Sequence, residues 1–121
     1  MRLAIVIPAL NEAANLSRLL PDLARGCPGA DIVVVDGGSG DDTAAVVARL
    51  PGPWLLESAR GRAVQMNHGA REAGGDTLLF LHADTRLPDG AARAIEQASP
   101  DSAFVLAYYA ARQACAALLA Q

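Results

Sequence analysis

The stretch DIVVVDGGSGDDTAAVVARL, residues 31–50, combines three features that indicate one fold class. Residues 31–36 are a short apolar run rich in valine, typical of a strand buried on both faces of a parallel sheet. A glycine-rich turn follows, and two aspartates then precede a helical pattern, where acidic side chains favour a helix start. A strand, a tight turn and a helix in this order indicate an α/β protein.

The same alternation continues outward from this stretch in both directions. Further strands are expected at 3–7, 53–57 and 76–82, and further helices from about Asn11, over 61–75 and from Pro88 to about Ala98. One apolar face of the first helix is formed by Leu16, Leu19, Leu20 and Leu23, while Pro21 should kink or restart that helix. The sequence therefore predicts an α/β fold with a Rossmann-like parallel sheet of about four strands flanked by helices.

The last part of the chain, residues 99–121, has a less distinct pattern. A helical stripe favours a C-terminal apolar helix and is made by Phe104, Tyr108, Ala111, Cys115 and Leu118. The segment FVLAYY alone could instead be a strand. Arg112 and Gln113 interrupt the apolar run, which argues against a membrane span. We expect a single domain over 1–121, with 1–98 as its core and 99–121 as a divergent C-terminal segment.

Composition and charge restrict the class of partner and the compartment. The chain has 121 residues and a net charge of −3, and its ten basic residues, all arginine, are scattered. No basic patch therefore points to nucleic acid as a partner. Cys27 and Cys115 form neither a metal-binding spacing nor a disulfide framework, which indicates a reducing compartment. Because the apolar run at 3–7 is too short for a signal peptide, we expect a cytoplasmic protein.

Polar side chains follow three of the predicted strands, at the point where each strand ends. Asn11 and Glu12 follow the first strand together with Pro8, Asp36 ends the second, and His82 and Asp84 follow the fourth. Ligands of parallel α/β sheets bind at the carboxyl ends of the strands, so we expect these residues to converge on one site. Asp-Thr and Asp-Gly-Gly are also ordinary turn sequences, which leaves a purely structural interpretation open.

Four segments resemble a known family in their order and spacing: IVIPALNE (5–12), IVVVDGGSGDDT (32–43), GRAVQMNHGA (61–70) and LLFLHADT (78–85). Together they look like the nucleotide-sugar-binding half of family 2 glycosyltransferases of the GT-A fold. The resemblance covers roughly residues 3–98, and the HADT and QMNHGA motifs look most like a bacterial branch of the family. It implies a glycosyltransferase that binds a nucleoside-diphosphate sugar and passes the sugar to an acceptor that the sequence does not identify.

The resemblance also implies roles for particular residues. Nucleotide-binding positions would be Pro8, Ala9, Asn11, Glu12, Asp36, Arg62, Gln65 and Asn67. Among these, Asp36 matches the family's acid that hydrogen-bonds the base or ribose. Arg62 could pair with phosphate in a two-pronged contact, although a solvated helix arginine is the alternative.

The hallmark of the family is an Asp-x-Asp triplet that holds a divalent cation on the diphosphate. The corresponding triplet here is His82-Ala83-Asp84, so an imidazole replaces one carboxylate. One carboxylate together with diphosphate oxygens can hold Mg²⁺, and an imidazole shifts the preference toward Mn²⁺. Asp84 is therefore the main metal-ligand candidate, while His82 either ligates the cation or only orients Asp84.

No catalytic base is identified from the sequence. Sugar transfer with inversion needs a group that takes the proton of the acceptor hydroxyl. The family supplies a carboxylate from a later, acceptor-binding half. After Asp84 this sequence offers only Asp89, Glu96 and Asp101, all on or beside predicted surface helices.

Three other interpretations stay open beside a small active transferase. The chain could be a truncated or non-catalytic nucleotide-binding module. It could complete its site with another subunit, using the C-terminal helix for homo-oligomerisation. It could also be a structural, oligomerising α/β protein that binds no nucleotide. Peripheral membrane association is compatible with all of these.

Overall fold

The computed structural model describes residues 2–98 and 107–109 and confirms the predicted alternation. The elements in chain order are β1 (Leu3–Ala9), α1 (Ala13–Gly26), β2 (Asp31–Asp36), α2 (Thr43–Ala48), β3 (Trp54–Glu57), α3 (Arg62–Glu72), β4 (Thr77–Leu81), α4 (Ala91–Ala98) and β5 (Ala107–Tyr109). Every paired strand is parallel, and the order in the sheet is β3-β2-β1-β4-β5. The fold is the predicted Rossmann-like sheet flanked by helices, with a short fifth strand added.

The central strand β1 stops pairing with its two neighbours, β2 and β4, at different residues. Pairing of β1 with β2 continues to Ala9 opposite Asp36, whereas pairing with β4 ends at Val6 opposite Phe80. Pro8 lies beyond this last β1–β4 pair and has no N–H to donate to a ladder. Strands β1 and β4 therefore part at their carboxyl ends. The strand order also reverses between them, and this is where ligands of such sheets bind.

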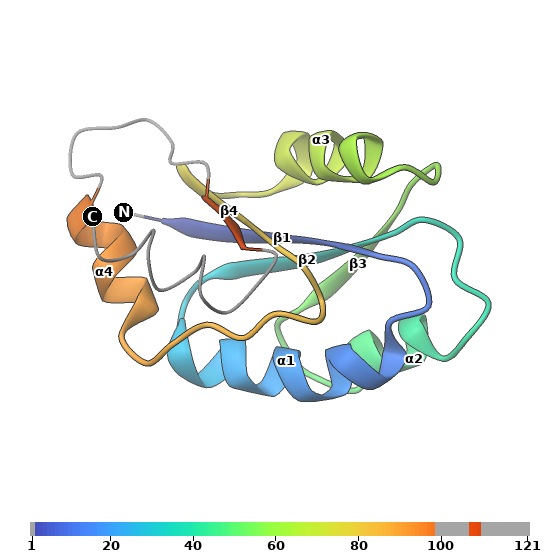
Figure 1. The fold of residues 1–121 in the computed structure, drawn as a ribbon, viewed down its shortest axis with the longest axis horizontal. Helices are drawn as coiled ribbons and strands as arrows, with labels where there is room; N and C mark the ends of the chain where they lie inside the picture. The colour runs from blue at the N-terminus through green and yellow to red at the C-terminus, as the bar shows by residue number, and fades with distance from the viewer. Residues whose placement is uncertain (1, 99–106, 110–121) are drawn as a thin grey trace.

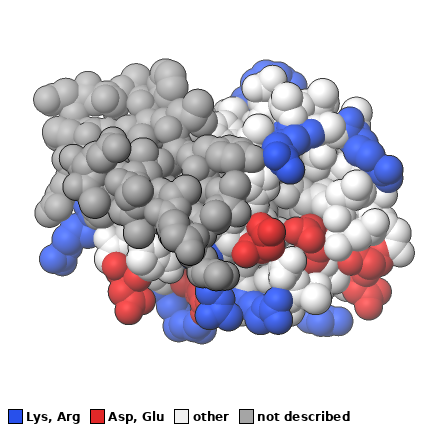
Figure 2. Space-filling view, viewed as in Figure 1, with Lys and Arg blue, Asp and Glu red and all other residues white. Residues whose placement is uncertain are grey.

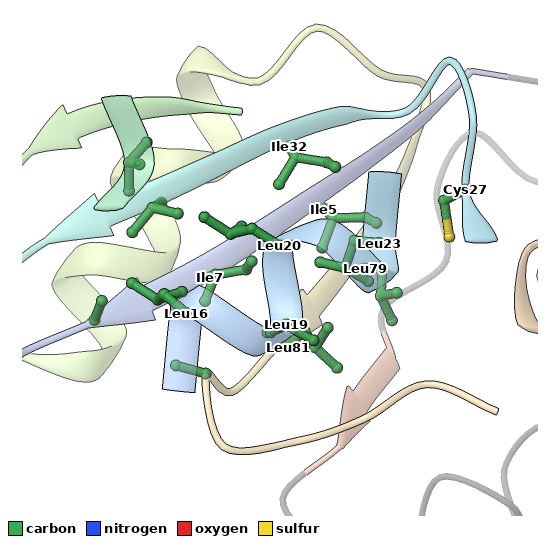
Figure 3. Packing of buried hydrophobic residues seen from close by; sticks show 14 of the residues in the cluster. Ile5, Ile7, Leu16, Leu19, Leu20, Leu23, Cys27, Ile32, Leu79 and Leu81 are labelled. Carbon is green, nitrogen blue, oxygen red and sulfur yellow. The ribbon is translucent and has the colours of Figure 1, made fainter. Parts of the chain in front are cut away.

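Helices cover both faces of the sheet. Helices α1 and α2 lie on one face and α3 lies on the other (Figure 1), as right-handed crossovers require when the strand order reverses. On the α1 face, the leucines predicted from the helical period pack against Ile5, Ile7, Leu79 and Leu81 (Figure 3). This confirms the predicted buried face of the first helix.

The opposite face is thinner and brings α3 very close to the sheet. Its buried cluster comprises Val6, Val33, Val35 and Phe80, with Met66 of α3 packed against it. A Cβ atom placed on Gly69 would lie only 2.4 Å from Cγ1 of Val6 and 2.8 Å from Cγ2 of Val35. The missing side chain of Gly69 therefore permits this close approach of α3.

Three helix boundaries or interruptions differ from the sequence prediction. Helix α1 begins at Ala13 after Glu12, one residue later than an N-cap at Asn11 would give. Asn11 instead has a left-handed φ of +55°. The helix continues through Pro21 to Gly26, so of the predicted kink or restart at Pro21 the restart is wrong. Helix α4 begins at Ala91 instead of Pro88, because Gly90 has a φ of +79° and ends a turn.

The prediction of a C-terminal helix is wrong for the three described residues of that segment. Ala107–Tyr109 form β5, paired in parallel with Leu79–Leu81. The open edge of β4 supplies backbone partners that a local helical stripe does not reveal. The rest of the stripe (Phe104, Ala111, Cys115 and Leu118) lies outside the described residues. Within residues 2–98 and 107–109, no helix has the length and apolar character needed to cross a membrane.

Candidate functional site

A cleft of about 270 Å³ lies at the carboxyl ends of β1 and β4. It is lined by Pro8, Ala9, Leu10, Glu12, Arg60, Gly61, Arg62, Gln65 and His82. These residues come from the end of β1, the β3–α3 connection with the first turn of α3, and the end of β4. Six of the ten predicted site residues line the cleft. Of the residues expected to converge from three strand ends, Pro8, Glu12 and His82 do so, whereas none from the end of β2 lines the cleft. A larger cavity of about 410 Å³ between the end of α1 and the segment before α4 contains none of them.

Asn11 lies beside the cleft and joins two loops. Its backbone N–H donates to Oγ of Ser39 at 2.8 Å, and its Oδ1 accepts from the N–H of Gly40 at 2.8 Å. Asparagine tolerates the left-handed backbone that this arrangement requires. The loop after β1 is therefore fastened to the loop after β2.

Asp36 shapes that second loop. Its Oδ1 accepts a bond from the N–H of Ser39 at 3.0 Å and one from the Ser39 hydroxyl at 2.6 Å. The side chain is half-buried and is absent from the lining of the cleft. The turn-forming role considered in the sequence analysis is therefore observed.

Asp41 completes the connection between the two loops. It accepts bonds from the N–H of Thr43 at 3.0 Å and of Ala13 at 3.1 Å, and also from the Thr43 hydroxyl. The bond from the Thr43 side chain is the main reason that the pKa of Asp41 lies below its ordinary value. The β1 loop thus reaches the cleft already held in place.

His82 and Asp84 occupy the turn at the end of β4, where the N–H of Thr85 donates to the carbonyl of His82 at 3.1 Å. His82 is half-buried and lines the cleft. Asp84 is exposed and faces a neighbouring hollow of about 100 Å³ beside α1. Burial first, and then the charge of Arg62, hold the pKa of His82 below 6.5, against the opposing effect of Asp84. The lowered pKa favours the neutral imidazole, which is the form that can bind a metal ion.

The donor set suits a cation only when a ligand completes it. Within the described ranges 2–98 and 107–109, no group of three or more histidine, cysteine, aspartate or glutamate side chains could hold a metal ion. A neutral imidazole and an exposed carboxylate on one turn can contribute two ligands. Mg²⁺ and Mn²⁺ commonly take their remaining ligands from substrate phosphates and water. His82 and Asp84 are of the ligand types that such a cation takes, but His82 lines the cleft whereas Asp84 lines the neighbouring hollow.

The structure adds residues to the cleft that sequence reasoning missed and leaves four predicted residues outside its lining: Asn11, Asp36, Asn67 and Asp84. Leu10, Arg60 and Gly61 line the cleft, whereas Asn67 lies on the exposed side of α3. Gly61 could have been found from its position directly before a helical pattern. In the structure Gly61 is the N-cap of α3 and has a φ of +140°. On the face shown in Figure 2, acidic and arginine side chains are interspersed. Positive charge at the cleft is therefore local, from Arg60 and Arg62.

These features define a Rossmann-like α/β protein with a polar ligand cleft at the point where its strand order reverses. The family model described as glycosyl transferase family 2 matches residues 4–112, and the chain belongs to this family. The sequence resemblance to this family is thereby confirmed.

Several known proteins are similar to the chain. A PGL/p-HBAD biosynthesis glycosyltransferase of Mycobacterium bovis is 41% identical over 91 residues, which covers 69% of this chain and 36% of the relative. A mannosyltransferase of Pyrobaculum calidifontis, solved with GDP-Man and Mn²⁺, is 28% identical with a TM-score of 0.71, covering 78% of this chain and 31% of that one.

A third match bears on the fold alone. Glucosyl-3-phosphoglycerate synthase of Mycobacterium tuberculosis, solved with Mn²⁺, UDP and glucosyl-3-phosphoglycerate, is 19% identical with a TM-score of 0.70. The match covers 84% of this chain and 40% of the synthase. The chain thus spans about a third of the length of the proteins that it matches, and its fold is that of GT-A glycosyltransferases.

Proposed function

We propose that this chain binds a nucleoside-diphosphate sugar together with a divalent cation and acts in transfer of the sugar to an acceptor that is still unidentified. The observation that carries the proposal is the convergence of Glu12, Arg62 and His82 on one cleft at the carboxyl edge of the sheet. The mannosyltransferase of Pyrobaculum calidifontis, which shares the fold at 28% identity, contains GDP-Man and Mn²⁺. Mn²⁺ is the cation that we propose for this chain too.

Each residue has a separate task in this proposal. Arg60 and Arg62 meet the negative charge of the diphosphate, since a guanidinium pairs well with phosphate oxygens. Asp36 does not line the cleft, so we propose that it offers a carboxylate oxygen to a base or ribose that extends beyond the cleft. His82 and Asp84 hold the cation, which when bound would offset the charge that develops on the departing nucleoside diphosphate.

Calorimetric titration tests donor binding. UDP, GDP, dTDP and CDP are each titrated into the protein with and without Mn²⁺. We expect one of them to bind, with an affinity that Mn²⁺ increases. Asp84→Ala should abolish that increase because it removes the exposed carboxylate of the proposed cation site. Asp89→Ala is the matched control, since Asp89 is also exposed and lies on the same connection but faces a different cavity.

The outcomes separate the alternatives. Binding that Mn²⁺ strengthens equally in the Asp84→Ala variant would refute the cation site. Binding without sugar transfer, with acceptors supplied, would identify a nucleotide-binding module in place of a transferase. Absence of binding by all four nucleotides, together with a concentration-dependent oligomer, would support a structural protein and refute the proposal.

A further inference from the structure

Gln65 is a polar side chain in the floor of the cleft and only 4% of it is exposed. It belongs to the first turn of α3, on the face that packs against the sheet. Burying an amide costs free energy unless its N–H and C=O groups are hydrogen-bonded. The partners of Gln65 therefore indicate why the amide is there.

Three hydrogen bonds connect Gln65 to three separate segments. Its Nε2 donates to the carbonyl of Ala9 at 3.0 Å and to that of Val35 at 2.8 Å. Its Oε1 accepts from the N–H of Gly61 at 3.1 Å. Ala9 ends β1, Val35 lies near the end of β2, and Gly61 caps α3. One side chain thus fixes the end of β1 relative to the start of α3, and both segments line the cleft.

Gly37 provides the space that this arrangement needs. A Cβ atom on Gly37 would lie 2.8 Å from Oε1, 2.9 Å from Cδ and 3.0 Å from Nε2 of Gln65. The backbone of Gly37 is outside the left-handed region, so its missing side chain matters for space and not for φ. The N–H of Gly37 also donates to the Ala9 carbonyl at 3.0 Å, the same oxygen that Gln65 contacts. Gln65 and Gly37 therefore form a complementary pair.

We propose that Gln65, seated against Gly37, is a positioning residue that sets the geometry of the donor cleft. The inference rests on the proposed function, because it assumes that the cleft binds the nucleotide. Both amide hydrogens of Gln65 are directed to backbone carbonyls, so its effect on a ligand passes through the placement of Ala9, Gly61 and Arg62. This role differs from the direct nucleotide contact that the family resemblance implies for Gln65.

A double-mutant cycle on the full chain tests the pair. The probe is the nucleoside diphosphate that binds the wild-type protein most tightly in the presence of Mn²⁺, titrated where all variants are folded. We expect Gln65→Ala and Gly37→Ala each to weaken its affinity about tenfold or more, which corresponds to a loss of about 1.4 kcal/mol in binding free energy. The double variant should bind no more weakly than Gln65→Ala, because truncating Gln65 leaves room for the new methyl group.

Two further variants separate positioning from general stability. Gln65→Met keeps the length of the side chain and removes its hydrogen bonds, so it serves where Gln65→Ala does not fold. Ile32→Val removes a buried methyl group near the amino end of β2, at the end of the sheet away from the cleft. It should lower stability and leave nucleotide affinity unchanged. Hydrogen exchange of the Gly61 N–H should accelerate in the Gln65 variants and not in Ile32→Val.

Each result has a distinct meaning. If the wild-type protein binds nucleotide and the Gln65 variants bind equally well, this inference is overturned and the proposed function stands. If the effects of Gln65→Ala and Gly37→Ala on affinity simply add, the pairing with Gly37 is refuted. If the wild-type protein binds none of the four nucleotides, the proposed function and the positioning role fail together.

Discussion

Replacing Gly69 with alanine tests the close packing of α3 on the sheet. The new Cβ would lie 2.4 Å from Cγ1 of Val6, and ordinary contact begins at 3.4 Å, so α3 must move away by roughly 1 Å. Overpacking of this kind costs about 1–3 kcal/mol, and the better helix propensity of alanine returns about 1 kcal/mol. We therefore expect Gly69→Ala to lower the free energy of unfolding by up to about 2 kcal/mol.

Urea denaturation measures this change, and Gly26→Ala is the matched control. Gly26 is the last residue of α1, and a Cβ there meets no atom within 4 Å. The control should be neutral or up to about 1 kcal/mol more stable than the wild-type protein. Gly69→Ala should also weaken nucleotide binding, because Gln65 lies one turn earlier on α3. A Gly69→Ala protein as stable as Gly26→Ala would refute the packing argument.

Two further predictions concern the loops that are fastened together beside the cleft. Asn11→Ala should be less stable than Asn11→Gly by about 1–2 kcal/mol in urea denaturation. Both variants lose the hydrogen bond from the N–H of Gly40, but only alanine is strained at a φ of +55°. Equal stabilities of the two variants would contradict this prediction. The pKa of Asp41 is lowered in the folded state, so its carboxylate stabilises the fold above its ordinary pKa of 3.8, and this contribution is lost as the pH falls through the lowered value. The difference in unfolding free energy between the wild-type protein and Asp41→Asn should therefore shrink in acid, as measured by denaturation at several pH values. A difference that does not change with pH would show that Asp41 acts without its charge.

Much of the fold could be predicted because local patterns determine it. The valine-rich run of β2 has the continuous apolar character of a strand buried on both faces. The leucine spacing of α1 indicated which face of that helix is buried. The start of α1 could not be predicted in the same way. A left-handed Asn11 depends on bonds with residues about thirty positions away, and a local capping rule does not include them.

The candidate site was predicted in part, for a similar reason. Glu12, Arg62 and His82 follow strands or open a helix, so a parallel sheet brings them to one edge. The bonds of Gln65 were not predictable, since they need the ends of two strands and the cap of α3 together in space. Strand β5 was ambiguous because a three-residue apolar segment becomes a strand only where a neighbouring edge accepts it.

The order of the strands has a consequence for synthesis of the chain. Strand β1 lies between β2 and β4, yet residues 77–81 of β4 are translated long after residues 3–9. At about 5–20 residues per second, one edge of β1 stays without its partner for roughly 4–14 seconds on the ribosome. An unpaired apolar strand edge can recruit other chains, so aggregation during translation is most probable in this interval. Early pairing of β1 with β2, and of β2 with β3, leaves this edge of β1 unpaired until β4 emerges.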